Sequence, residues 1–346
     1  MTIKEIARLS GVSTATVSYV INSSRNVTHE KRDRVLKVIE QSGYKPNLIA
    51  KSLRVRKTDI IGILAEDIRG FPTPSIINGI SEFAEQNGYN ILLNDLRMLE
   101  TLFNQYDHIG QHKEKINEAI SLLLYGAKVD AVIYVGMFDR DITGIINEIN
   151  KPLVIAYSTS SDPYTHSVTY DNEDISKAVI RMLLDTGHRR IAVITGLRHT
   201  FPAQTRMRGV MRAFSEYGLS WDSALVRYGD WEYSSGYACA SELLASSPTA
   251  IFAMNDLMAA GAIDAVKNAG LRIPDDISVI GFDNREVSLF LHPRLTTVEI
   301  DLKGIGLRAA QTALQRIRGE NIEERCQVIP SKLILRDTTR RKGELL

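Results

Sequence analysis

The sequence predicts an α/β protein with a small helical head, a short linker and a body of two parallel α/β subdomains. From residue 59 onward, apolar runs of strand length alternate with segments of helical periodicity. This alternation is typical of parallel sheets that helices cover on both faces. Because the number of strands is large for a single sheet, the pattern favours two subdomains with a cleft between them. A ligand is then expected at the carboxyl ends of the strands.

The charge of the chain is unevenly distributed. The 346 residues carry a formal net charge of only +1. Residues 1–60, however, hold 12 Lys or Arg against 5 Asp or Glu, and the remainder holds 30 against 36. A basic head on an acidic body predicts that an anionic polymer binds to the head alone. A basic terminal segment can also be no more than a solvated face.

The two cysteines, Cys239 and Cys326, have no paired spacing, which favours a reducing compartment and no metal site. The amino terminus lacks a cationic segment followed by an apolar run, so no signal peptide is expected. No apolar stretch approaches the length of a membrane span. We therefore expect a cytoplasmic protein without a membrane partner or a cofactor.

The segment Ile3–Asn22 predicts a helix-turn-helix with its corner at Gly11, where a left-handed backbone is needed. The expected inward positions are Ile6, Ala7 and Ser10 in the first helix and Val12, Val17 and Val20 in the second. Ser13 caps the second helix in this interpretation. The residues that then face outward are Thr14, Ala15, Thr16, Ser18 and Tyr19. This uncharged face suits base edges in a major groove, although an ordinary helical hairpin is the alternative.

A third helix is expected over His29–Gln41, ended by Gly43. Pro46 then breaks the pattern, and a short helix is expected over Leu48–Leu53. Such a helix is too short to be stable alone, so it should become ordered against DNA and a partner copy. Leu53 can then wedge between base steps of the minor groove. The alternative is a connector packed on the body.

The body contains eight strand-like runs and six segments of helical periodicity. The expected strands are Ile60–Ala65, Asn90–Leu93, Val129–Val135, Leu153–Tyr157, Ile191–Thr195, Leu225–Tyr228, Ala250–Met254 and Ser278–Phe282. The expected helices are Ser75–Gln86, Ile116–Tyr125, Asp174–Asp185, Thr205–Tyr217, Asp256–Asn268 and Leu302–Arg318. A further strand-like run, Ser331–Leu335, precedes a short tail without a leucine heptad, which favours a dimer over a tetramer.

With these segments in hand, the sequence closely resembles the lactose/galactose repressor (LacI/GalR) family over nearly its whole length. The most specific marks are IKEIARLSGVSTATVSYVIN, GYKPNLIAKSL, TGHRRIAVITG and NDLMAAGAIDAVKNAGLRIPDDISVIGFDN followed by PRLTTV. The resemblance implies a DNA-binding head at 1–46, a hinge helix at 47–57 and an effector-binding and dimerisation domain at 58–346. It also implies a body with the fold of periplasmic sugar-binding proteins, and a homodimer that binds a pseudo-palindromic operator.

The resemblance also implies the residues that contact DNA. Its candidate base readers are Thr14, Ala15, Tyr19 and Arg25, and its phosphate contacts are Thr16, Ser18 and Asn22. Leu53 matches the intercalating leucine, with Ala50 and Arg54 beside it.

The expected effector site, also implied by the resemblance, consists of Asp67, Phe71, Tyr157, Arg206, Trp231, Asn255 and Asp283. An indole stacks on the apolar side of a pyranose, and Arg and Asp bind hydroxyl groups in pairs. Each residue also has a structural alternative. Trp231 could be ordinary core, Arg206 and Asp283 could pair with each other, and Asn255 could cap a helix.

Two departures from the family pattern concern the effector. Tyr157 stands where the family usually has an aspartate, at the end of the run PLVIAY. The segment from Asp95 to Ile116 is longer than the usual loop, and it could line or cover the cleft. It carries Tyr106, His108 and His112, but its surroundings look like a loop and no metal site is expected there.

Three classes of function compete. The first is a DNA-binding transcriptional repressor controlled by a small effector, a mono- or oligosaccharide. The second is a sugar-modifying enzyme, but the sequence has no G-x-S-x-G elbow, Walker loop or convincing carboxylate pair, so no catalytic residues are expected. The third is a sugar-binding protein whose nucleic-acid-binding head is only accessory. The basic head favours the repressor.

Overall fold

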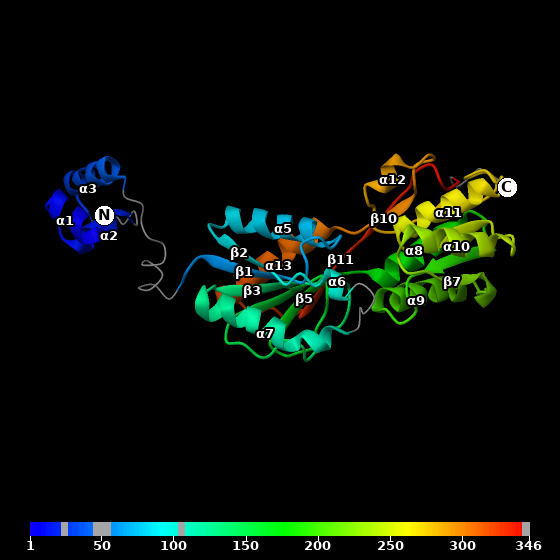
Figure 1. The fold of residues 1–346 in the computed structure, drawn as a ribbon, viewed down its shortest axis with the longest axis horizontal. Helices are drawn as coiled ribbons and strands as arrows, with labels where there is room; N and C mark the ends of the chain where they lie inside the picture. Colours follow the sequence, from blue (N-terminus) through cyan, green and yellow to red (C-terminus); the bar gives the residue numbers. More distant parts are fainter. Residues whose placement is uncertain (22–26, 44–56, 103–107, 341–346) are drawn as a thin grey trace. The chain divides into compact units, whose positions relative to one another are not determined.

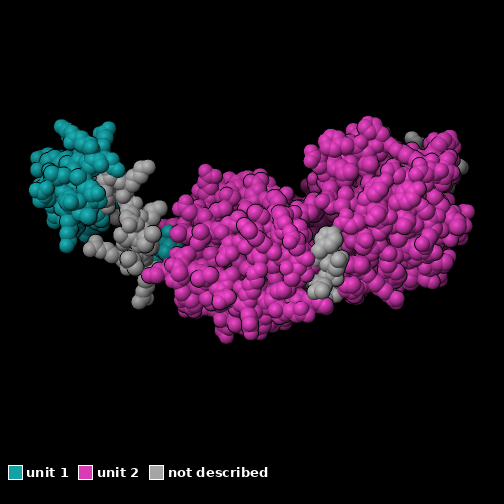
Figure 2. Space-filling model, viewed as in Figure 1, with its two compact units in different colours: residues 1–58 teal, residues 59–346 magenta. Residues whose placement is uncertain are grey.

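The computed structural model describes residues 1–21, 27–43, 57–102 and 108–340. The chain divides into two compact units, residues 1–58 and 59–346, shown in teal and magenta in Figure 2. The expected hinge helix lies outside the described residues. So do the predicted residues Asn22, Arg25, Ala50, Leu53, Arg54 and Tyr106.

Among the described residues of the first unit lie the helices α1 (Ile3–Ser10), α2 (Thr14–Ile21) and α3 (His29–Ser42). Its small core consists of the five buried residues Ile6, Ala7, Val17, Val20 and Val35. Gly11 turns the chain with φ +64°, and its N–H donates back to the carbonyls of α1. The predicted inward positions are thereby confirmed, except that Val12 is only half-buried.

The first lobe of the body is a six-stranded sheet in the order β11-β5-β4-β3-β1-β2, and every neighbouring pair is parallel. Its strands are β1 (Ile60–Ala65), β2 (Asn90–Asp95), β3 (Ala131–Val135), β4 (Leu153–Ala156), β5 (Thr165–Tyr170) and β11 (Cys326–Ile329). The helices α5 (Thr73–Gln86) and α13 (Leu302–Ile317) cover one face, and α7 (Lys113–Ser121) covers the other (Figure 1). A π-helical turn, Leu122–Gly126, continues α7.

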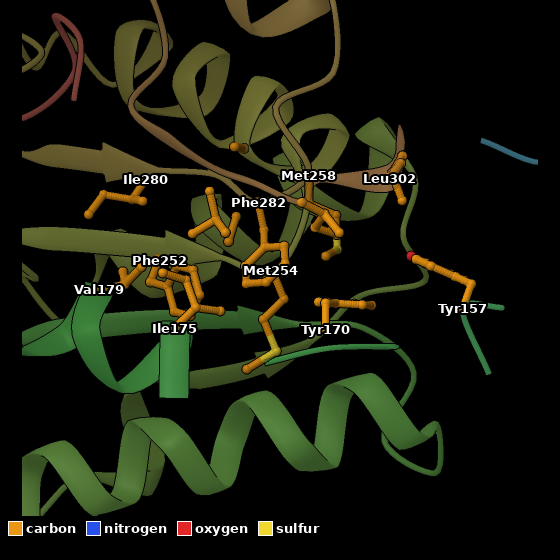
Figure 3. Close-up of a cluster of buried hydrophobic side chains, with 14 of the residues drawn as sticks. Tyr157, Tyr170, Ile175, Val179, Phe252, Met254, Met258, Ile280, Phe282 and Leu302 are labelled. Atoms are coloured by element: carbon orange, nitrogen blue, oxygen red, sulfur yellow. The ribbon is translucent and has the colours of Figure 1, made fainter. Parts of the chain in front are cut away.

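The second lobe is a four-stranded parallel sheet in the order β7-β6-β8-β9. Its strands are β6 (Ile191–Thr195), β7 (Val226–Tyr228), β8 (Ala250–Ala253) and β9 (Ser278–Ile280). Its helices are α8 (Asn172–Asp185), α9 (Phe201–Glu216), α10 (Tyr233–Leu244), α11 (Asp256–Asn268) and α12 (Val287–Phe290). Ile175 and Val179 of α8 pack beside Phe252 of β8 in the buried core (Figure 3).

The chain passes between the two lobes three times, after β5, after β10 (Thr297–Glu299) and after β11. The crossings are joined to one another. β10 pairs antiparallel with β12 (Lys332–Ile334), and the Asp171 carboxylate accepts the N–H of Ser331 at 2.7 Å. The three crossings therefore form the covalent connection between the two lobes.

The eight predicted strands and six predicted helices of the body are all present, as is the strand near residue 333. The strands β5, β10 and β11, the helix α10 and the short helices α6 (Leu99–Leu102) and α12 were not predicted. The sequence of β5 is polar, THSVTY, although every residue of the strand is buried. The buried face of α10 consists mostly of small residues, so its apolar periodicity is weak. In the described residues, no helix is long and apolar enough to cross a membrane.

Candidate functional site

The outward face of α2 is the candidate DNA-contacting surface. Thr14, Ala15 and Tyr19 are exposed, Tyr19 by 50% of its surface. The Ser13 hydroxyl accepts the N–H of Thr16 at 3.1 Å, which confirms the predicted cap. Thr16 and Ser18 are half-buried.

Among the described residues of the three helices, the exposed cations lie on α1 and α3. Lys4 and Arg8 are exposed on α1, and Lys31, Arg34 and Lys37 are exposed on α3. The head therefore combines an uncharged helix face with solvated cations, which suits base edges and phosphates respectively. Neutralising phosphates is the main source of affinity for DNA.

The body contains a cavity of about 410 Å³ that residues of both lobes line. It lies where the parallel strands end, because its wall residues follow β1, β3 and β4 in the first lobe and β7, β8 and β9 in the second. Six predicted effector residues line it: Phe71, Tyr157, Arg206, Trp231, Asn255 and Asp283. Its aromatic residues are Phe71, Phe138, Tyr157, Tyr170, Phe201 and Trp231.

Three of these wall residues have a left-handed backbone, which side chains other than glycine seldom adopt. Their φ angles are +71° at Tyr157, +75° at Trp231 and +106° at Asp283. Each comes shortly after a strand ends, so the strained turn directs a large or charged side chain into the cleft. A Cβ on Gly196 would lie 1.9 Å from the Trp231 ring, so only glycine leaves room for the indole there. Strain of this kind concentrates at binding sites.

Arg206, on α9, is 3% exposed and is fixed from several sides. Its Nε donates to Asn172 Oδ1 at 2.8 Å, its Nη2 donates to the Tyr170 hydroxyl at 3.0 Å, and its Nη1 donates to the carbonyl of Met254. The guanidinium also lies 3.5 Å from the centre of the Phe282 ring. Its position is therefore set before any ligand arrives.

Asp283 Oδ1 lies 4.0 Å from Arg206 Nη2, so the two residues form an ion pair at long distance. Burial raises the pKa of the Asp283 carboxyl to about 6, against the lowering effect of the charges of Arg206 and Arg285. Among the described residues, no side chain or backbone group donates a hydrogen bond to this carboxylate. It therefore keeps its capacity to accept hydrogen bonds from a ligand.

Asn255 is the N-cap of α11, as the structural alternative held. Its Oδ1 accepts the N–H of Met258 at 2.8 Å, and its Nδ2 donates to the carbonyl of Trp231 at 2.7 Å. Asn255 thus links the indole turn to the helix. It lines the cavity with its main hydrogen bonds already made, and its contact with an effector stays a prediction.

Tyr157 and Tyr170 stack with their ring centres 5.3 Å apart and an angle of 20° between the planes. Burial raises the pKa of Tyr170 to about 12 and also raises that of Tyr157, so both phenols stay neutral. Where the family pattern usually supplies a carboxylate, this chain supplies an aromatic wall.

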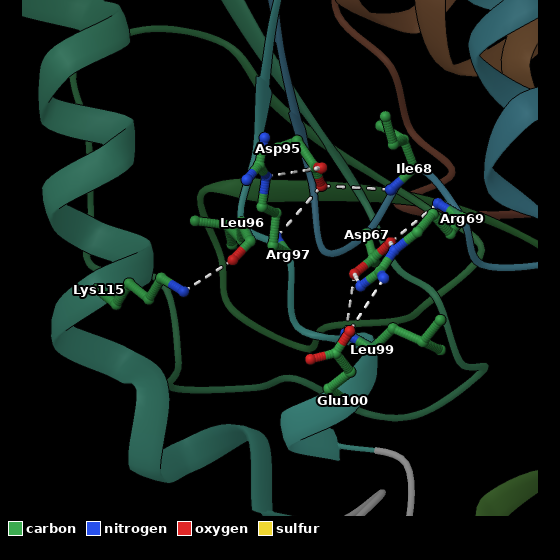
Figure 4. Close-up of polar contacts among 9 residues, drawn as sticks. All are labelled: Asp67, Ile68, Arg69, Asp95, Leu96, Arg97, Leu99, Glu100 and Lys115. Atoms are coloured by element: carbon green, nitrogen blue, oxygen red, sulfur yellow. Dashed lines mark hydrogen bonds and ion pairs between the residues drawn. The ribbon is translucent and has the colours of Figure 1, made fainter.

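Asp67 does not line the cavity, unlike the other predicted effector residues. Its carboxylate accepts hydrogen bonds from Arg69 Nε and Nη2, both at 3.0 Å, and from the N–H of Leu99 (Figure 4). Glu100 pairs with the same guanidinium at 3.1 Å. Because Arg69 does line the cavity, Asp67 is placed to orient Arg69 rather than to touch a ligand.

The long segment 95–116 contributes Leu99 to the cavity wall through the short helix α6 (Leu99–Leu102). Its second described part, residues 108–116, begins with the 3₁₀ turn His108–His112, which carries the two histidines. Over the part of the chain that the structure describes, no group of three metal-binding side chains is found.

Sequence reasoning missed several charged wall residues, namely Arg69, Asp139, Arg140 and Arg285. Arg285 lies over the ring of Phe71 at 4.7 Å, a contact between the two lobes. These four residues, and Glu232 of the same wall, follow a strand by four or five residues. Listing every polar residue just after each predicted strand would have found them.

Comparison with known proteins agrees with this architecture. Residues 2–47 match the model of bacterial regulatory proteins of the lacI family, and residues 157–339 match a periplasmic binding protein-like domain. The transcriptional repressor PurR of Pasteurella multocida is 32% identical over 344 residues, covering 98% of each chain. The chain belongs to the LacI family. It is therefore a DNA-binding transcriptional regulator, and its body is an effector-binding domain.

Two solved structures match over 98% of this chain and 99% of their own. One is the lac repressor dimer bound to operator and the anti-inducer ONPF, with 25% identity and a TM-score of 0.81. The other is the transcriptional regulator CelR in complex with cellobiose, with 28% identity and a TM-score of 0.66. The expected α/β fold with a helix-turn-helix head is thereby confirmed.

Proposed function

We propose that this LacI-family chain is a repressor whose operator affinity is controlled by a carbohydrate of disaccharide size, bound in the cavity between the lobes. The observation that supports this most is the composition of the wall. Aromatic rings from both lobes surround a fixed guanidinium, Arg206, and an accessible carboxylate, Asp283.

Each part of the wall has a role with a sugar. Aromatic faces stack on the C–H face of a pyranose, while charged groups that are nearly buried bind hydroxyls strongly and penalise ligands that lack them. The volume of about 410 Å³ falls in the usual range of ligand pockets, roughly 300–1,000 Å³. Rings from both lobes give stacking surfaces for two sugar rings. The CelR relative, whose complex contains cellobiose, is consistent with this size.

On the DNA side, we propose that Thr14, Ala15 and Tyr19 read bases, with Arg25 as a further reader. Contacts to phosphates are assigned to Thr16, Ser18 and Asn22. The linker residues Ala50, Leu53 and Arg54 are assigned to the minor groove. A homodimer presents two α2 helices, so the operator is proposed to be a pseudo-palindrome of two half-sites.

A ligand that contacts both lobes binds one lobe arrangement better than another. That difference in affinity is what shifts the equilibrium between arrangements. The three crossings carry the shift to the segment before β1, which leads to the head. Because coupling is reciprocal, operator DNA must change sugar affinity by the same factor as sugar changes operator affinity.

The decisive experiment is a gel-shift titration of operator DNA, selected from a random library, in the presence of cellobiose, D-glucose, D-ribose or adenine. We expect cellobiose to change operator affinity most. Adenine tests a second candidate, because the stacked Tyr157 and Tyr170 rings would also suit a planar base. A response to adenine alone would replace the sugar by a nucleobase. A chain that selects no operator from the library would contradict the proposed reading by α2.

The proposed target is DNA and the proposed control is reversible binding, so no covalent chemistry is assigned to the cavity. A repressor of this kind works in the cytoplasm, where its operator and its effector meet.

A further inference from the structure

Asp139 is a carboxylate in the cavity wall that the family pattern does not assign. It follows β3, lines the cavity and is 3% exposed. Its Oδ2 accepts a hydrogen bond from Asn172 Nδ2, whereas its Oδ1 is buried and has no hydrogen-bond partner among the described residues. A buried acceptor without a donor costs free energy, which a ligand can recover by supplying that donor.

The neighbouring hydrogen bonds fix which oxygen is left over. Arginine can only donate, so Arg206 Nε must face the oxygen of the Asn172 amide, at 2.8 Å. The amide nitrogen of Asn172 is thereby turned towards Asp139. One carboxylate oxygen of Asp139 is therefore held, and the other remains without a donor at the cavity wall.

The position of Asp139 relates to the departure at Tyr157. Strand β3, which precedes Asp139, pairs directly with β4, which precedes Tyr157. Tyr157 fills the position where the family usually has an aspartate, and it stacks on Tyr170. The first lobe thus gains an aromatic surface after one strand and keeps a buried carboxylate after the adjacent strand.

We propose that Asp139 binds a hydroxyl of the effector, accepting its hydrogen bond at Oδ1, and so takes the place of the strand-end aspartate that Tyr157 replaces. This rests on the proposed carbohydrate function and names a further specificity-determining residue for it. Asp139 of the first lobe and Asp283 of the second lobe then accept hydrogen bonds from hydroxyls of the sugar. The fixed guanidinium of Arg206 donates hydrogen bonds to the sugar. The effector class that fits is a sugar with free hydroxyls at both ends, rather than an apolar ligand.

A hydrogen bond from a hydroxyl stabilises the charged carboxylate, so sugar binding should be coupled to the ionisation of Asp139. Burial raises the pKa of this carboxyl to about 7, while the charge of Arg206 and the hydrogen bond from Asn172 lower it. The other titratable groups that interact with it are Tyr170 of β5 and Cys326 of β11. Sugar affinity should therefore fall as the pH is lowered from 8 to 6.

The test uses the full chain and calorimetric titration with cellobiose, replaced by D-glucose or D-ribose if the unaltered protein does not bind cellobiose. Asp139→Asn keeps the acceptor for Asn172 but turns the free oxygen into an NH₂ group. Asp130→Asn is the matched control, because Asp130 is also buried, at 4% exposure, but lies before β3 and outside the cavity wall.

We expect Asp139→Asn to weaken sugar affinity by about 10- to 100-fold at pH 8, as for the loss of a charge-assisted hydrogen bond. In the unaltered protein, sugar affinity should decrease between pH 8 and pH 6. In Asp139→Asn, most of this decrease should be absent. Asp130→Asn should change neither the affinity nor its pH dependence.

Monodeoxy derivatives of the bound sugar separate contact from positioning. The derivative that lacks the hydroxyl bound by Asp139 should bind the unaltered protein more weakly than the parent sugar does. To Asp139→Asn, this derivative and the parent sugar should bind with equal affinity. A purely structural role would lower the affinity for every derivative by one common factor. That result, or an unchanged affinity in Asp139→Asn, would overturn the assignment of Asp139 and leave the carbohydrate proposal standing. If none of the three sugars binds the unaltered protein, the carbohydrate proposal falls, and the Asp139 assignment falls with it.

Discussion

The head and the body place their candidate functional residues in opposite environments. In the head, the predicted base readers Thr14, Ala15 and Tyr19 are exposed on a regular helix above a core of five buried residues. In the body, the cavity residues Arg206 and Asp139 are 3% exposed. Tyr157, Trp231 and Asp283 also have strained backbones.

This difference reflects the two kinds of ligand. DNA is a large polyanion that is recognised by docking a surface, so its readers need little support beyond a stable helix. A small effector has few atoms. It therefore binds with sufficient free energy only when groups that are already in position surround it. Substitutions in the two regions should therefore affect different properties.

The largest effect is expected for Arg206→Ala. The buried guanidinium satisfies Asn172, Tyr170 and the carbonyl of Met254, so its removal leaves several buried groups without partners. We expect the free energy of unfolding of the body to fall by about 3–5 kcal/mol. Urea unfolding followed by tryptophan fluorescence measures the body alone, because both tryptophans lie there. Arg198→Ala, an exposed arginine of the same lobe, is the control and should change stability little.

Asp283→Asn should weaken binding of the effector by about 10- to 100-fold, because its carboxylate is the accessible acceptor of the second lobe. Asparagine is chosen since it tolerates a positive φ, here +106°, better than alanine. Calorimetry with the sugar that the gel-shift panel identifies gives the affinity. Asp275→Asn, at an exposed site of the same lobe, serves as control. Full affinity in Asp283→Asn would place the effector elsewhere.

Tyr19→Ala should cost about 1–3 kcal/mol of operator affinity and relax the preferred base sequence. Because half of the Tyr19 surface is exposed, the substitution should leave the unfolding of the body and its sugar affinity unchanged. Selection from a random DNA library compares the preferred sites. Leu36→Ala, an exposed apolar residue on α3, is the matched control. An unchanged base preference in Tyr19→Ala would exclude α2 as the reading helix.

The last expected effect concerns the pH dependence of stability. Burial raises the pKa values of Asp283, Asp139 and Asp256 to about 6, 7 and 8. An acid whose folded pKa is raised stabilises the fold below its unfolded pKa, and this contribution is lost as the pH rises through the folded value. Burial lowers the pKa values of His166 and His188, so these two groups act in the opposite sense.

Comparison with Asp139→Asn isolates one of these groups. Relative to the unaltered body, the variant should gain stability from pH 5 to about pH 7, by at most about 1.4 kcal/mol per pH unit, and the difference should level off above the folded pKa of Asp139, about 7. Tryptophan-detected urea unfolding at four pH values measures the difference. A constant difference across this range would mean that Asp139 does not titrate there.

The sequence alone determined the head almost completely. Its inward residues, the corner at Gly11 and the cap at Ser13 are local features, set by helix periodicity and by single residues. Most strands and helices of the body were also predicted, because continuous apolar runs bounded by glycines identify elements that are buried on both sides, whereas the polar strand β5 escaped this criterion. The family resemblance added six of the cavity residues.

Only the tertiary structure decided which of the body's polar residues meet, and in what state. Asp139, Asn172 and Arg206 are far apart in the sequence, and no local pattern shows that one amide joins them. That Arg69 lines the cavity while Asp67 does not, and that the Asn255 amide donates to the carbonyl of Trp231, likewise depends on how the ends of the strands pack together. The physical reason is that burial and hydrogen-bond partners are properties of the assembled lobes, whereas periodicity is a property of the chain.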